Sequence, residues 1–101
     1  MALDFHRLDN NEYLFGLDDH IYTHLEVIFT EYKHQTGIFV DPYGDTELTV
    51  DKQKIILKII DTYINTTDLN VNKEKTIEIM WFRALISYFS DKEIIIKILG
   101  D

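Results

Sequence analysis

The chain has no cysteine and only one proline, and its four glycines stand singly. Without cysteine it has neither a disulfide framework nor a thiolate zinc site. Single glycines do not make a glycine-rich phosphate-binding loop, and no serine-centred catalytic motif is present. The apolar runs are only a few residues long, which is far too short to span a membrane. The first residues lack a basic region followed by an apolar stretch, so we expect no secretory signal and a cytoplasmic location.

Fixed positive charge is scarce in the first half of the chain. Residues 1–51 contain eleven carboxylates but only two bases, Arg7 and Lys33, whereas residues 52–101 contain seven carboxylates and eight bases. The net charge of −8 therefore comes from the first half. A surface of this kind repels nucleic acid and anionic lipid and attracts a basic protein. We expect a basic protein partner, and neither nucleic acid nor a membrane.

The length and composition are those of one globular domain. A chain of 101 residues with 46% hydrophobic content is long enough to bury a core without disulfides. No repeat, low-complexity segment or internal linker interrupts it. We predict a single domain over residues 1–101.

The clearest predicted helix covers residues 18–36. Asp18 or Asp19 can cap its start, and Gly37 can end it in the left-handed conformation. Apolar residues recur through it at helical spacing and form one stripe, which predicts a helix that packs on a core with one face.

Two further helices are predicted in the second half. Thr49 is a suitable cap for a helix over residues 50–65. The helix over residues 73–89 is apolar nearly all round, which is typical of a central, buried helix. On this basis Trp81 belongs to the core, and Trp81→Ala should cost roughly 3–5 kcal/mol.

The segments outside the helices favour short strands. Residues 3–16 alternate weakly around a turn, which indicates a β-hairpin or an extended arm. Residues 38–48 contain a short extended piece and a turn at 41–44. Ser90 and Glu93 have capping-box spacing, but the isoleucine-rich residues 94–100 favour a strand that pairs with the N-terminal segment. We predict a mostly helical α+β fold with three main helices and short strands near both termini; the alternative is a small all-α bundle.

One pair of histidines has metal-ligand spacing. His20 and His24 are one helical turn apart, and Glu31 and His34 continue the same polar stripe. The glutamate that makes such a pair a metalloprotease motif is absent, because Ile21 follows His20. An exposed polar face explains these residues, and we expect no bound metal.

Other carboxylates also have simple structural explanations. The acids of residues 41–51 could suggest calcium, but their spacing does not follow the EF-hand pattern. Asp18 and Asp19 are adjacent, so they point in different directions, and acids are common in first helical turns. We therefore expect no cofactor and no enzymatic activity.

Three aromatic residues lie in loops or edges beside acids, namely Tyr13, Phe15 and Tyr43. Aromatic rings next to carboxylates are good anchors for a partner rich in arginine or lysine, although buried loop aromatics are also common. The sequence thus indicates a binding surface more than a reaction centre.

The segment 29–48, FTEYKHQTGIFVDPYGDTEL, resembles short bacterial proteins encoded in toxin–immunity systems. The small size, acidic charge and richness in Ile, Asn, Lys and Tyr also resemble the immunity proteins that neutralise secreted bacterial toxins. The resemblance implies a tight one-to-one complex with a toxin domain. It carries over no particular binding residue and no single fold.

These observations predict a small acidic binding protein, an immunity protein that blocks a basic toxin domain. The predicted partner-binding residues are Asp18, Asp19, Tyr43, Asp45, Glu47 and Phe15. The alternative is a non-catalytic regulatory or structural subunit that forms a homodimer through apolar surface. A small enzyme without a readable motif is a third alternative.

Overall fold

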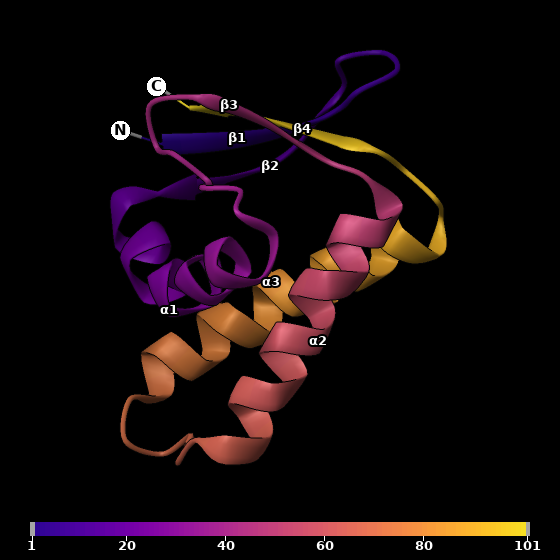
Figure 1. Cartoon of the computed structure of the whole chain (residues 1–101). Helices are drawn as coiled ribbons and strands as arrows, with labels where there is room; N and C mark the ends of the chain where they lie inside the picture. The colour runs from indigo at the N-terminus through magenta and orange to yellow at the C-terminus, as the bar shows by residue number, and fades with distance from the viewer. Residues whose placement is uncertain (1, 101) are drawn as a thin grey trace.

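The computed structural model describes residues 2–100, which form four strands and three helices. In chain order these are β1 (Ala2–Arg7), β2 (Tyr13–Asp18), α1 (Asp19–Thr36), β3 (Asp45–Leu48), α2 (Val50–Thr66), α3 (Lys73–Asp91) and β4 (Ile96–Gly100). The strands form one antiparallel sheet of order β2-β1-β4-β3, and the helices lie together below it (Figure 1). The predicted α+β class is confirmed, and the all-α alternative is wrong.

The two ends of the chain meet in the centre of the sheet. Strand β1 forms a hairpin with β2 and pairs on its other side with β4, where Phe5 lies opposite Ile98. The prediction of a C-terminal strand that pairs with the N-terminal segment is therefore confirmed. Strand β3 adds an edge next to β4, with Leu48 opposite Ile96. The short extended piece predicted from the three apolar residues 38–40 does not form a strand, and β3 lies after the turn, over Asp45–Leu48.

The helix boundaries follow the local capping signals. The Asp18 carboxylate accepts a hydrogen bond of 2.8 Å from the backbone N–H of Ile21, and Gly37 ends α1 with φ of 76°. Thr49 caps α2 by accepting from the backbone N–H of Lys52 at 3.4 Å. These side chains satisfy N–H groups that have no partner within the helix. None of the described helices is both long and apolar enough to cross a membrane.

The core lies between the sheet and the helices, and Phe82 of α3 is at its centre. Its ring centroid lies 5.9 Å from that of Phe5, 6.1 Å from that of Phe15 and 5.8 Å from that of Phe29. Through these edge-on contacts the fully buried ring of Phe82 connects α3 to β1, β2 and α1. Phe82, not its neighbour, therefore has the place that the sequence suggested for Trp81.

Helix α3 is buried on one side only, so the prediction of an all-round buried helix is wrong. The buried apolar side consists of Ile79, Phe82, Ile86 and Phe89. On the other side lies an exposed apolar row, the α3 stripe, made of Ile77, Met80, Trp81 and Tyr88. Trp81 is 38% exposed, and its ring makes an edge-on contact with Phe15, with the ring centroids 5.7 Å apart. A two-layer fold leaves the outer side of each helix in solvent, whatever its composition.

Candidate functional site

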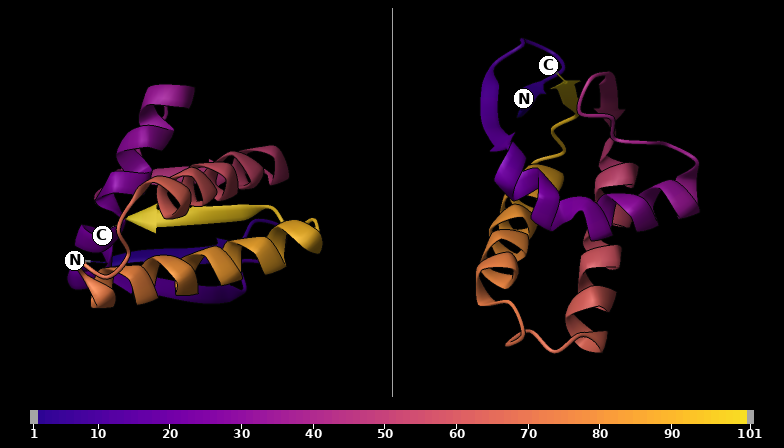
Figure 2. Two further views of the ribbon diagram at one scale, coloured as in Figure 1. Left: turned by 90° about the horizontal axis from the view of Figure 1, so that it is seen from below. Right: turned by 90° about the vertical axis from the view of Figure 1, so that its left-hand side faces the viewer.

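The helices cover one face of the sheet, and the other face is open (Figure 2). Side chains alternate between the two faces along each strand, so every second residue points away from the helices. We call this open surface the outer sheet face. It consists of Asp4, His6, Tyr13, Asp45, Glu47, Lys97 and Leu99, together with Gly16.

The strand register gathers carboxylates on the outer sheet face. Asp4 lies opposite Leu99, which lies opposite Asp45 on its other side. Glu47 lies opposite Lys97 in the adjoining row. Since neighbouring strands are about 4.8 Å apart, Asp4 and Asp45 are separated by about 10 Å. Acids from opposite ends of the first half of the chain therefore share one surface.

Asp18 and Asp19 lie at the same end of the sheet. Asp18 ends β2 opposite Ala2, two residues beyond the row in which Asp4, Leu99 and Asp45 lie side by side. Three strand spacings and two residues along the strand direction separate Asp18 from Asp45, which corresponds to about 16 Å. Both Asp18 and Asp19 are exposed, although Asp18 also caps α1.

Tyr43 stands at the edge of this surface and is 72% exposed. Its turn is held by Asp41, whose carboxylate accepts from the Tyr43 N–H at 2.8 Å. The Gly100 N–H donates to the Gly44 carbonyl at 2.9 Å, which ties the turn to the end of β4. A β-carbon on Gly100 would lie 2.6 Å from that carbonyl oxygen, so only glycine allows this close approach. The ring is thus presented from a fixed turn.

Phe15 is the one predicted contact residue that cannot serve as an anchor, because it is only 7% exposed and lies in the core. The register shifts between Phe5 and His6, so Phe5 pairs with Phe15 whereas His6 pairs with Tyr13. Leu14 is the extra residue of this β-bulge. Tyr13 and Phe15 consequently point to opposite faces, and Tyr13 has the exposed ring.

Gly16 makes room for the Tyr13 side chain on the outer sheet face. A β-carbon at Gly16 would lie 2.7 Å from the Tyr13 hydroxyl oxygen and 3.2 Å from a carboxylate oxygen of Asp4. The ring therefore lies flat across the strand, with its hydroxyl beside an acid. This places a second exposed aromatic residue among the carboxylates.

The few cations near the outer sheet face already have partners. Lys97 donates to the Asn11 side-chain oxygen at 2.6 Å. Arg7 makes two hydrogen bonds of 3.0 Å to Asp9, and they hold the pKa of that carboxyl below its ordinary value. No such pair is formed by Asp45 or Glu47 within the described ion pairs of residues 2–100. The surface has a negative potential because its three carboxylates, Asp4, Asp45 and Glu47, outnumber Lys97.

A separate groove of about 660 Å³ lies between α1 and α2. Its lining combines Val27, Ile59 and Tyr63 with threonine hydroxyls and with Glu31 and His34, whose Oε1 and Nδ1 atoms are 3.7 Å apart. This mixture suits a partner's side chain as well as a small ligand. The groove therefore does not distinguish between classes of function.

The side chains considered for metal binding are arranged differently from the sequence pattern. Glu31 and His34 form their own pair and do not approach His20 and His24. Within residues 2–100, the histidines and carboxylates that converge are His20, His24 and Glu78, and the acids of residues 41–51 do not form such a group. Glu78 comes from α3 and was not predicted, because it lies more than fifty residues along the chain.

Comparison of the chain with models of protein families, with curated proteins and with solved structures found no match. The outer sheet face offers charge and exposed rings in one place, and these are features of a protein-binding surface.

Proposed function

We propose that the protein is a small acidic binding protein that neutralises a basic bacterial toxin domain by forming a tight one-to-one complex. The observation that carries the proposal is the open outer sheet face, on which carboxylates and exposed tyrosines lie together. The resemblance of residues 29–48 to proteins of toxin–immunity systems agrees with it. The complex would form in the cytoplasm and would involve neither cofactor nor catalysis.

The acids and the rings have different roles in this proposal. Asp18, Asp19, Asp45 and Glu47 attract a basic surface over a distance near the Debye length, about 8 Å at physiological salt. They act mainly on the association rate. Tyr43 offers a rigid, largely exposed ring that can fill a pocket or stack on an arginine, so it acts mainly on dissociation.

The size of the surface indicates how far the interface extends. A stable interface covers about 800 Å² on each partner, which is about one seventh of the 5736 Å² accessible surface of the chain. Four strands of about five residues span a flat area of only roughly 300 Å². The interface therefore has to include the Tyr43 turn and the start of α1, where the other predicted contact residues lie.

A growth assay tests the proposed activity. A toxin-like domain encoded beside this gene is expressed in a bacterial host with and without the protein. Co-expression should restore growth, and the purified mixture should contain a one-to-one complex. If the protein neither restores growth nor binds any neighbouring toxin domain, the proposed function is wrong.

Charge neutralisation tests which surface binds. With the toxin domain in hand, replacing Asp18, Asp19, Asp45 and Glu47 by Asn or Gln should slow association by roughly tenfold or more and flatten its salt dependence. Tyr43→Ala should raise the dissociation rate by a similar factor with little effect on association. Stopped-flow kinetics across a salt series measures both.

The matched control neutralises four exposed acids on the helices, Glu26, Glu31, Asp51 and Asp91. It changes the net charge by the same four units but leaves the outer sheet face intact. The control should slow association much less. An equal effect of both variants would mean that the overall charge attracts the partner and that the assigned surface is wrong.

The α3 stripe favours a second candidate function, a subunit that forms a homodimer through apolar surface. Its four large exposed side chains lie on one helix, and contiguous exposed apolar patches mark interaction sites. If this is the function, the protein sediments as a dimer at micromolar concentration, and Ile77→Asp with Trp81→Asp converts it to a monomer. We expect a monomer by analytical ultracentrifugation, since the first candidate requires a single chain.

A further inference from the structure

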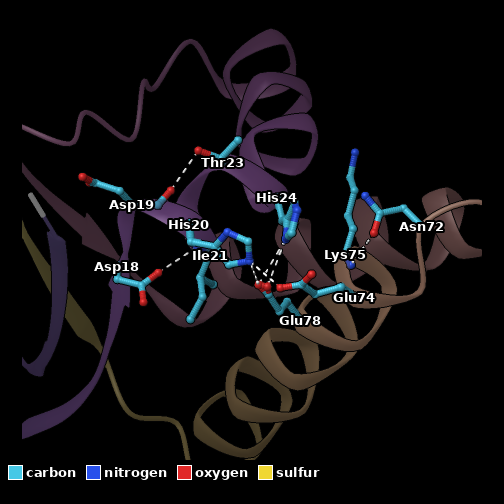
Figure 3. Close-up of polar contacts among 10 residues, drawn as sticks. All are labelled: Asp18, Asp19, His20, Ile21, Thr23, His24, Asn72, Glu74, Lys75 and Glu78. Atoms are coloured by element: carbon cyan, nitrogen blue, oxygen red, sulfur yellow. Dashed lines mark hydrogen bonds and ion pairs between the residues drawn. The ribbon is translucent and has the colours of Figure 1, made fainter.

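Two pairs of side chains meet between α1 and α3, and they form what we call the His–Glu cluster (Figure 3). His20 and His24 are one turn apart on α1, and Glu74 and Glu78 are one turn apart on α3. The helices pack so that each histidine faces one glutamate. His20 Nε2 lies 2.5 Å from Glu74, and His24 Nδ1 lies 3.0 Å from Glu78.

Glu78 connects the two halves of the cluster. One of its carboxylate oxygens lies 3.0 Å from His24 Nδ1, and the other lies 3.6 Å from His20 Nε2. The ligand-type atoms of these three residues all lie within 4.8 Å of one another. Bond lengths of 2.0–2.2 Å in a tetrahedral zinc site place neighbouring ligand atoms about 3.3 Å apart. Changes in side-chain torsion angles of α1 and α3 are therefore enough to close the site.

The chemistry of the four groups selects the kind of ion. Imidazole nitrogens bind zinc and other late transition metals, whereas calcium and magnesium prefer oxygen ligands alone. Two neutral imidazoles and two carboxylates balance the charge of Zn²⁺.

One histidine–glutamate pair of the cluster is mostly buried, and the other is mostly exposed to solvent. His24 and Glu78 are mostly buried, with 17% and 14% of their side chains exposed. His20 and Glu74 form the rim and are mostly exposed. An ion can thus enter from solvent past the rim and be held by two side chains whose helices are already packed together.

We propose that the His–Glu cluster binds one divalent zinc ion, with His20, His24 and Glu78 as ligands and Glu74 in the fourth position. This replaces our expectation from the sequence that no metal is bound. The ion bridges α1 and α3, and it stabilises the fold by binding the folded state alone. The site lies between α1 and α3, outside the outer sheet face, although His20 directly follows Asp18 and Asp19 at the start of α1 (Figure 3). The zinc proposal does not rest on the proposed toxin complex.

Zinc titration of the tag-free, EDTA-treated protein tests the site. Isothermal titration calorimetry with zinc chloride should show one saturable equivalent, and zinc at 100 times its dissociation constant should raise the melting temperature by roughly 10 °C or more. Cobalt in place of zinc should give the intense visible absorption of a tetrahedral complex. Calcium should give neither heat nor thermal shift.

Variants assign the binding to the four residues. His20→Ala and Glu78→Gln should each weaken zinc binding by roughly tenfold or more. His20 is largely exposed, so its replacement leaves the fold intact, as circular dichroism should show. The matched control is Glu31→Gln with His34→Ala, which removes a histidine–glutamate pair of α1 without a converging third residue.

The control should leave zinc affinity and stoichiometry unchanged. The absence of saturable zinc binding would overturn the proposal, as would an affinity that His20→Ala does not lower. An equal loss in the control would overturn it too, because the binding would then be spread over surface histidines. In each of these cases the four side chains only form an ion-pair bridge between two helices.

Discussion

Replacing Phe82 by alanine should lower the free energy of unfolding by about 3–5 kcal/mol, whereas Trp81→Ala should cost only about 1–2 kcal/mol. The Phe82 ring is fully buried and contacts three other phenylalanine rings of the core. Its loss leaves a cavity at the point where the sheet and α3 meet. The Trp81 ring is larger but is already 38% exposed, so less surface is returned to water. Urea denaturation followed by circular dichroism measures both values.

A loss of this size is a large part of the total stability of a small domain, about 5–15 kcal/mol. Phe82→Ala can therefore unfold the protein, and Phe82→Leu serves as the milder variant. It should still cost about 1 kcal/mol, because leucine fills most but not all of the ring's volume. If Trp81→Ala is as costly as Phe82→Ala, Trp81 contributes as much to the core as Phe82 does, and α3 is buried on both sides.

Trp81 was wrongly assigned to the core because the amino-acid composition of a helix does not show which of its sides is buried. The buried side of α3 repeats at spacings of three and four residues, through Ile79, Phe82, Ile86 and Phe89. Apolar residues on the remaining surface hide this period in the sequence. Only the position of α3 at the boundary of a two-layer fold decides which side is buried.

Helix ends were predictable because their causes are local. Asp18, Gly37 and Thr49 act within three or four residues of their own position, so the sequence contains the whole interaction. The isoleucine-rich C-terminal strand was predictable from β-branched side chains, which suit a pleated surface. The short strand β3 was not, since Asp45–Leu48 forms a strand only by pairing with β4.

The acidic character of the candidate binding surface was predictable from the sequence, but the identity of each exposed residue was not. Asp45 and Glu47 are on the outer sheet face because of their register with β4. Phe15 and Tyr13 were equivalent candidates by sequence, since both lie in one strand beside acids. Because Leu14 is an extra residue in the strand, the Phe15 ring points into the core and the Tyr13 ring points into solvent.

The His–Glu cluster was beyond local reasoning for a different reason. His20 and His24 have metal-ligand spacing, but the residues that face them are Glu74 and Glu78, at a separation of 54 positions. Nothing in the sequence fixes how α1 crosses α3. The regular spacing of the two pairs is informative only when the helices are known to pack in register.

Replacing Gln53 by methionine should lower the free energy of unfolding by about 2–3 kcal/mol. Gln53 is fully buried in α2, between two lysines that suggest an exposed position. Its side-chain amide donates to the Leu48 carbonyl at 3.0 Å and to the Ile94 carbonyl at 2.7 Å. These carbonyls lie at the end of β3 and before the start of β4. Methionine fills the same space but leaves both without this donor.

The side-chain oxygen of Gln53 has no hydrogen-bond partner, so its removal offsets part of the loss. The matched control is Gln35→Met, because Gln35 is an exposed glutamine of α1 that donates only to Glu31, at 3.0 Å. Its replacement should change stability by less than about 0.5 kcal/mol. Hydrogen exchange of β3 and β4 should increase in Gln53→Met alone, since the lost bonds join these strands to α2. If both variants are equally stable, the buried amide does not hold the two strand ends together, and methionine packs there as well as glutamine does.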